Sequence, residues 1–147
     1  MLWKFRFLPF LLLVSATALA QSGLTIDKVG KEPVRKGDGT KIVAFTSVIE
    51  GVVTDPAISV YVLVKAHDAA SERAFAATVD SSQPESSKGY RWRAVCQFGE
   101  LIGDAGGLYE ARAVAISNSG VQRGKLLETL QASKIKSDVI KLSRGNN

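Results

Sequence analysis

The feature of this sequence that most restricts its fold is a series of short segments rich in β-branched and aromatic residues, separated by turn-forming residues. The segment ISVYVLVKA (58–66) is apolar on both faces, which is typical of a central strand. Six more segments have strand-like patterns: residues 24–29, 42–53, 73–80, 90–98, 108–117 and 137–143. Together they predict an all-β fold, a two-sheet sandwich of about seven strands. Helix-like spacing is limited to Leu126, Leu127 and Leu130, enough for about one helical turn.

The first 20 residues are typical of a secretory signal peptide. They carry Lys4 and Arg6 without an acid, followed by an apolar run that ends in a small-x-small site. That run covers residues 8–20, which is too short for the ~20 apolar residues of a spanning helix. We therefore expect cleavage between Ala20 and Gln21 and a secreted or periplasmic location. The mature chain, residues 21–147, is expected to be one domain without a transmembrane span; a retained, uncleaved segment is the alternative.

The positive charge of the expected mature chain is concentrated near its C-terminus. Residues 118–147 hold six basic residues against two acidic ones: Arg123, Lys125, Lys134, Lys136, Lys141 and Arg144 against Glu128 and Asp138. Such a segment could attract an anionic partner, but its scattered charges are also typical of a solvated face. Nucleic acid is not an expected partner of an exported protein.

The segment YRWRAVCQF (90–98) combines aromatic residues, arginines and the single cysteine. Side chains alternate between the two faces of a strand. One face is therefore predicted to point into the core, and it carries Tyr90, Trp92, Ala94, Cys96 and Phe98. The two arginines, Arg91 and Arg93, then lie on the solvent-exposed face. In the segment 108–117, the same alternation places Tyr109, Ala111, Ala113 and Ala115 inward. Gly51 is predicted to leave room for a large inward ring, that of Trp92.

Three stretches, VIEGVVTDPAISVYVLVK, GYRWRAVCQFGE and YEARAVAIS, resemble the immunoglobulin-like and fibronectin-III-like modules of exported bacterial proteins. The resemblance covers about half of the mature chain and rests on glycines, apolar alternation and one tryptophan. It implies a seven-stranded sandwich with a structural or interaction role, and it names no ligand. The two-cysteine bridge of antibody-type domains is missing, because Cys96 is the only cysteine.

Catalytic, cofactor and metal sites are not predicted. Cys96 could act as a nucleophile only beside a base, and the one histidine, His67, lies at the far end of another strand. One histidine and one cysteine cannot build the usual zinc or copper ligand sets. Asp38 in GDG and Asp55 in TDP could bind calcium, but aspartate and glycine are equally favoured in turns. We therefore expect a protein that is not an enzyme.

The remaining surface feature is an outward row of Arg91, Arg93, Glu110 and Arg112. If the two strands are neighbours, Glu110 can pair with an arginine across the ladder. Because arginine is enriched in interfaces, this row is the predicted partner surface. The leading function is an exported binding or structural module that engages a protein partner. One alternative is a carbohydrate- or envelope-binding module that uses the basic C-terminal segment and exposed aromatics, with Tyr61, Phe75 and Tyr109 as candidates. The other is an exported enzyme of unfamiliar type.

Overall fold

The computed structural model of the chain describes residues 23–100, 103–117, 121 and 124–146. The predicted signal peptide and its cleavage site at Ala20 and Gln21 lie outside these residues. The described residues form β1 (Leu24–Val29), β2 (Glu32–Pro33), β3 (Lys41–Val43), β4 (Thr46–Val53), β5 (Ser59–Ala66), β6 (Arg73–Val79), β7 (Tyr90–Gln97), β8 (Leu108–Ile116), α1 (Leu126–Ala132), β9 (Ile135–Lys136) and β10 (Ile140–Arg144). The all-β prediction is confirmed, and each predicted strand has a counterpart; the segment 42–53 is divided between β3 and β4. No helix among the described residues is long and apolar enough to cross a membrane.

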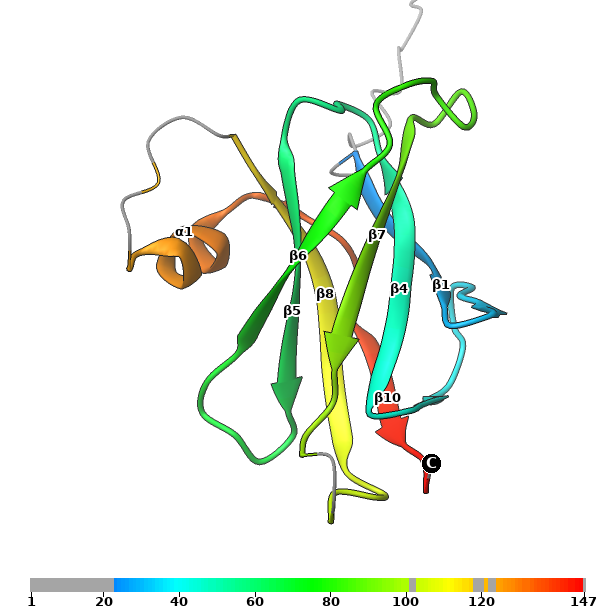
Figure 1. Cartoon of the computed structure of the whole chain (residues 1–147), viewed down its shortest axis with the longest axis vertical. Coiled ribbons are helices and arrows are strands. Elements are labelled where there is room, and N and C mark those ends of the chain that lie inside the picture. The colour runs from blue at the N-terminus through cyan, green and yellow to red at the C-terminus, as the bar shows by residue number, and fades with distance from the viewer. Residues whose placement is uncertain (1–22, 101–102, 118–120, 122–123, 147) are drawn as a thin grey trace, which may run out of the picture.

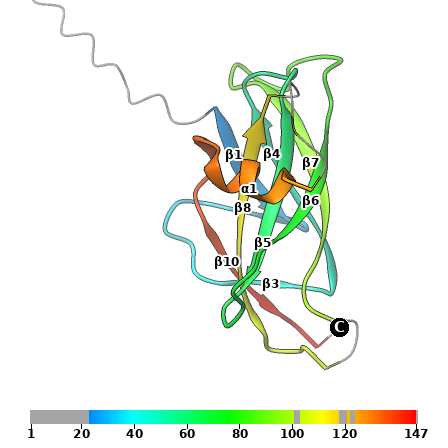
Figure 2. The same cartoon turned by 90° about the vertical axis from the view of Figure 1, so that its left-hand side faces the viewer.

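The prediction of a two-sheet sandwich is wrong. The strands form one sheet in the order β2-β1-β4-β7-β6-β5-β8-β10-β3, with β9 beside β8, and this sheet is curled into a half-barrel (Figures 1 and 2). The reason lies in β6, which changes its partner along its length. Its first four residues, from Arg73, pair with β5, and its last three, up to Val79, pair with β7. Hydrogen bonding therefore continues from one wall of the half-barrel to the other.

The core fills the concave side of the curled sheet. Trp92, Ala94, Cys96 and Phe98 are at most 1% exposed, which confirms the predicted inward face of β7. Tyr90, assigned to the same face, is only half-buried at the start of the strand. On β8 the inward residues are the predicted ones, with Tyr109 edge-on to the ring of Phe98. Small and large side chains from the two walls thus meet inside the half-barrel.

A second, smaller core lies on the outer side of β8. Alternation from the inward Tyr109 places Val114 and Ile116 on the opposite face of β8, yet both are buried. They pack with Leu63 of β5 and with Leu130 of α1, which covers this part of the sheet (Figure 1). The helix is nearly two turns long, slightly more than the predicted single turn.

Gly51 makes space for Trp92, as predicted. The two residues are in register on the neighbouring strands β4 and β7. A Cβ atom at position 51 would lie 2.6 Å from Cζ2 of Trp92 and 1.7 Å from the carbonyl oxygen of Thr25 on β1. Glycine therefore allows the indole and the backbone of β1 to approach β4 at the same point.

We predict that Gly51→Ala lowers the free energy of unfolding by about 1–3 kcal/mol, because the new methyl group must displace both a core ring and a neighbouring strand. Gly39→Ala is the matched control, since its Cβ would have no heavy atom within 4 Å. Urea unfolding followed by circular dichroism measures both. Equal stability of the two variants would contradict the close packing of Trp92 on Gly51.

Candidate functional site

The four residues of the predicted partner surface do not form one row. Arg91 and Arg93 lie on β7, whose ladder partners are β4 and β6. Glu110 and Arg112 lie on β8, which pairs with β5, β10 and β9. Because the two strands are not neighbours, Glu110 cannot pair with an arginine of β7 across a ladder. In register it lies between Lys65 and Lys141 instead.

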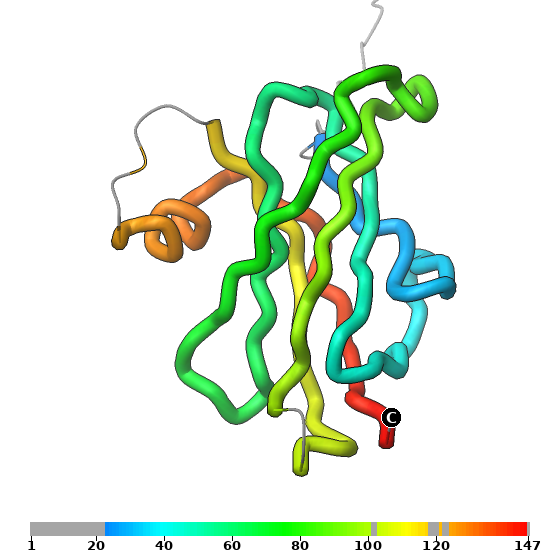
Figure 3. The backbone as a smooth tube through the Cα atoms, viewed as in Figure 1, coloured from blue at the N-terminus to red at the C-terminus, as the bar shows by residue number. Residues whose placement is uncertain are grey.

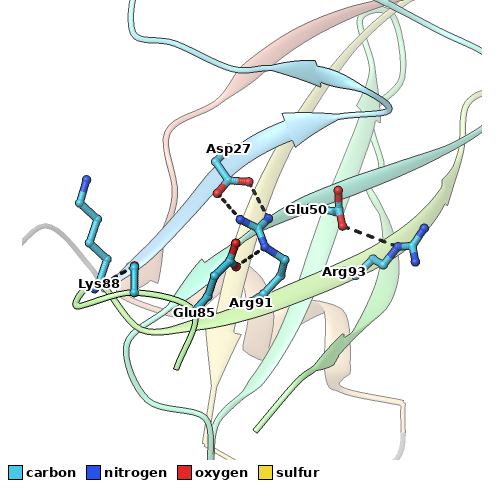
Figure 4. Close-up of polar contacts among 7 residues, drawn as sticks. Asp27, Glu50, Glu85, Lys88, Arg91 and Arg93 are labelled. Atoms are coloured by element: carbon cyan, nitrogen blue, oxygen red, sulfur yellow. Dashed lines mark hydrogen bonds and ion pairs between the residues drawn. The ribbon is translucent and has the colours of Figure 1, made fainter. Parts of the chain in front are cut away.

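Arg91 holds two other segments against β7 (Figure 4). Its guanidinium donates two hydrogen bonds of 2.9 Å to the carboxylate of Asp27 on β1, reaching across β4. It also donates to Glu85 in the connection between β6 and β7. The hydrogen bonds to Asp27 and then to Glu85 raise the pKa of Arg91 above its ordinary value. This arginine is thus committed to internal contacts.

The other two arginines of the predicted surface also face carboxylates. Arg93 lies 3.8 Å from Glu50 on the neighbouring β4, and its side chain is 64% exposed. Arg112 lies 3.5 Å from Glu72, and both side chains are mostly covered. Each guanidinium therefore has an acidic neighbour within the protein, which leaves this surface little unbalanced charge for a partner.

A cleft lies where the two ends of the curled sheet approach each other, and we name it the seam cleft. Its volume is about 690 Å³, within the ~300–1,000 Å³ of typical ligand sites. One wall is β1 at residues 24–26, and the other is the segment 136–141 leading into β10. Residues of the connection 34–40 complete the lining. This connection runs from β2 beside β1 to β3 beside β10 (Figures 2 and 3).

Strand edges without a neighbouring strand border the seam cleft. Gly23 bonds toward β4, because its carbonyl oxygen accepts the N–H of Thr54 at 2.7 Å. Successive residues of a strand direct their backbone N–H and C=O groups to alternate sides, so those of Leu24 and Ile26 point away from β4. Among the described residues, β2 covers that edge only from Lys28 onward. On the opposite side, β3 lies beside β10 only from Leu142 onward. The cleft is therefore bounded by two short open edges.

The charges of the seam cleft are predominantly basic. Its lining includes five basic and two acidic residues: Arg35, Lys36, Lys41, Lys136 and Lys141 against Asp38 and Asp138. Lys41 is paired with Asp38 at 3.2 Å, and the pKa of Asp38 is lowered first by the backbone N–H of Arg35 and then by Lys41. Lys136 donates to the carbonyl oxygen of Gln131. The side chains of Arg35, Lys36 and Lys141 form no ion pair with another described residue.

A second cavity of about 620 Å³ lies at the N-terminal end of β8, between the β5–β6 and β7–β8 connections. His67, Asp68, Asp104 and Tyr109 are part of its lining. The carboxylate of Asp104 accepts the backbone N–H of Glu100, so it stabilises the loop. Burial, and then the charge of Asp104, raise the pKa of Tyr109. No group of three or more metal-ligating side chains occurs in the described part of the chain.

Arg144 is a buried residue that sequence reasoning assigned to a solvated basic face. It is 5% exposed, and it donates to the carbonyl oxygens of Phe98, at 3.0 Å, and Glu100. Its guanidinium lies 5.1 Å from the ring centre of Phe45. Strand alternation from the buried Leu142 places position 144 on the same face, which is the signal that could have identified it. Arg123, of the same predicted basic segment, lies outside the described residues.

No protein-family model matches this sequence, and a comparison with curated proteins finds no significant relative. The immunoglobulin-like and fibronectin-III-like resemblance thus stays an expectation drawn from short motifs.

We predict that Arg91→Ala lowers the free energy of unfolding by about 1–3 kcal/mol, because it leaves a partly covered Asp27 without its charged hydrogen bonds. Arg93→Ala is the matched control on the same strand, with an expected loss below about 1 kcal/mol because its ion pair is exposed. Urea midpoints of the two variants are the measurement. A larger loss for Arg93→Ala would show that Arg91 does not hold β1 and the β6–β7 connection in place.

Cys96 is predicted to be chemically inert in the folded protein. It is a free, fully buried thiol, and burial raises its pKa to about 12. At pH 8 we expect no reaction with Ellman's reagent within an hour in buffer and complete reaction within minutes in 8 M urea. Fast reaction of the native protein would mean that the β7 face is open to solvent.

Proposed function

We propose that this chain is an exported, non-catalytic binding module that engages an acidic protein partner through the seam cleft. The observation that carries the proposal is the excess of unpaired basic side chains around a cleft of ligand-binding size. Arg35, Lys36 and Lys141 contribute this excess. Asp138 is the one acid of the lining without an ion pair to another described residue, and Glu110, on β8, lies in register with Lys141. Positive potential in a cleft attracts and orients negatively charged partners.

The structure gives less support to the carbohydrate alternative. Sugar rings are usually held by aromatic side chains presented at the surface, and the lining of the seam cleft includes no aromatic residue. Phe75 is half-buried and lies beneath the guanidinium of Arg73 at 5.3 Å. Tyr61 packs against the α1 core and Tyr109 is buried in the main core. The aromatic residues considered for sugar binding therefore serve packing.

The enzyme alternative also lacks a supporting site. The buried Cys96 has no route to a substrate while the sheet is folded. At the second cavity, the carboxylate of Asp104 is already engaged by the backbone N–H of Glu100. A binding role for the seam cleft needs no reactive group.

Fluorescence anisotropy with labelled poly-L-glutamate tests the proposal at low salt. Lys36→Glu should weaken binding by about 3- to 10-fold, since a unit charge about 4 Å from its partner contributes about 1 kcal/mol in water-like surroundings. Lys88→Glu is the matched control, because it changes net charge equally and Lys88, in the β6–β7 connection (Figure 4), is not part of the cleft lining. Raising the salt concentration should weaken binding.

Two results would count against this function. If both reversals weaken binding equally, attraction depends on net charge and not on the cleft. If an acidic polysaccharide or anionic lipid vesicles bind far more tightly than poly-L-glutamate, and Lys36→Glu abolishes that binding, the partner is an envelope component and not a protein.

A further inference from the structure

The geometry of the seam cleft points to the form of its partner: we propose that it binds an extended acidic peptide segment, which pairs as an added strand with the open edges bordering the cleft. This inference rests on the proposed function, because it assigns a conformation to the acidic partner proposed above. It differs from simple charge attraction in requiring hydrogen bonds between two backbones.

The first observation is the set of backbone groups at the cleft wall. Leu24 and Ile26 direct their N–H and C=O groups toward the cleft, as the register of β1 on β4 requires. The edge of β10 before Leu142 faces the same space. Leu24 is buried at the inner end, whereas Ile26, Ile140 and Lys141 are more accessible. Uncovered strand edges of this kind are templates for pairing with another chain.

The second observation is where the edges end. The bulge in β1 falls at Asp27, whose carbonyl oxygen accepts the N–H of Val34 at 2.9 Å. That hydrogen bond closes one end of the open edge, and β3 closes the other side from Lys41 onward. The free length is therefore short, so the site suits a peptide of a few residues and not a long sheet-to-sheet contact. The connection 34–40 encloses the cleft, so the open edge is not available for pairing with a long strand of another sheet.

The third observation is the difference between the inner and outer surroundings of the cleft. Leu24, Ile26, Val34 and Ile140 give it an apolar inner lining, and they pack in or against the main core. Lys36 and Lys141 are exposed at its outer side. Side chains of a bound strand alternate between the two directions. The complementary sequence thus alternates apolar residues, directed inward, with acidic residues, directed toward the lysines.

The test uses an octapeptide that alternates glutamate with valine, together with two analogues methylated at every second peptide nitrogen, one in each register. A strand donates its N–H groups to a given edge from alternate residues only. We expect the parent peptide to bind the purified protein and shift the amide resonances of Leu24, Ile26 and Lys141 in nitrogen-15 spectra. One methylated analogue should bind at least about 10-fold more weakly, and the other should retain binding.

The outcomes separate this inference from the proposed function. If the parent and both analogues bind equally and Lys36→Glu weakens all three, the cleft recognises charge, and strand pairing is excluded while the proposed function stands. If the parent peptide does not bind although poly-L-glutamate does, the strand-addition mode is overturned in the same way. If both methylated analogues lose binding and the parent peptide shifts the resonances of Ile26 and Lys141, the peptide pairs with the edges of β1 and β10 together. If Lys36→Glu and Lys88→Glu weaken the binding of poly-L-glutamate equally, both proposals are wrong.

Discussion

The divided pairing of β6 is the interaction on which the rest of the structure depends. Because Arg73 to Ala76 pair with β5 and Ala77 to Val79 pair with β7, the hydrogen-bond network has no break between the two walls. The sheet must then curl to bury its apolar side, and its two ends come to face each other. The core and the seam cleft are both consequences of this geometry: the core fills the concave interior, and the cleft is the place where the ends do not meet.

Two groups of basic residues in this protein have different physical roles. Arg91 and Arg144 tie distant segments together through hydrogen bonds to Asp27, Glu85 and the carbonyl oxygens of the β7–β8 connection. Those around the seam cleft extend from a loop and a strand edge, and the lining there holds five basic residues against two acidic ones. Charge that is matched internally contributes stability, and only unmatched charge is available for recognition.

Much of the strand layout and of the core could be predicted from local pattern. Alternation along residues 90–98 identified Trp92 and Cys96 as inward, and the missing side chain of Gly51 indicated where the indole lies. The same rule failed for Val114 and Ile116, because it assumes that the second face of a strand is wet. Only the docking of α1 decided otherwise. The row of Arg91, Arg93, Glu110 and Arg112 failed for a related reason, since it assumed that consecutive strands are neighbours.

The sequence by itself determined that this chain is all-β, which residues of β7 and β8 face the main core, and that its stability depends on packing without disulfides. These properties follow from side-chain alternation and residue type, which are local. Tertiary structure alone decided that the strands form one curled sheet, which arginines are paired, and that Leu24 and Ile26 border an open cleft beside Lys36 and Lys141. Such features depend on which strands become neighbours, and strand neighbourhood is set by contacts between residues far apart in the chain.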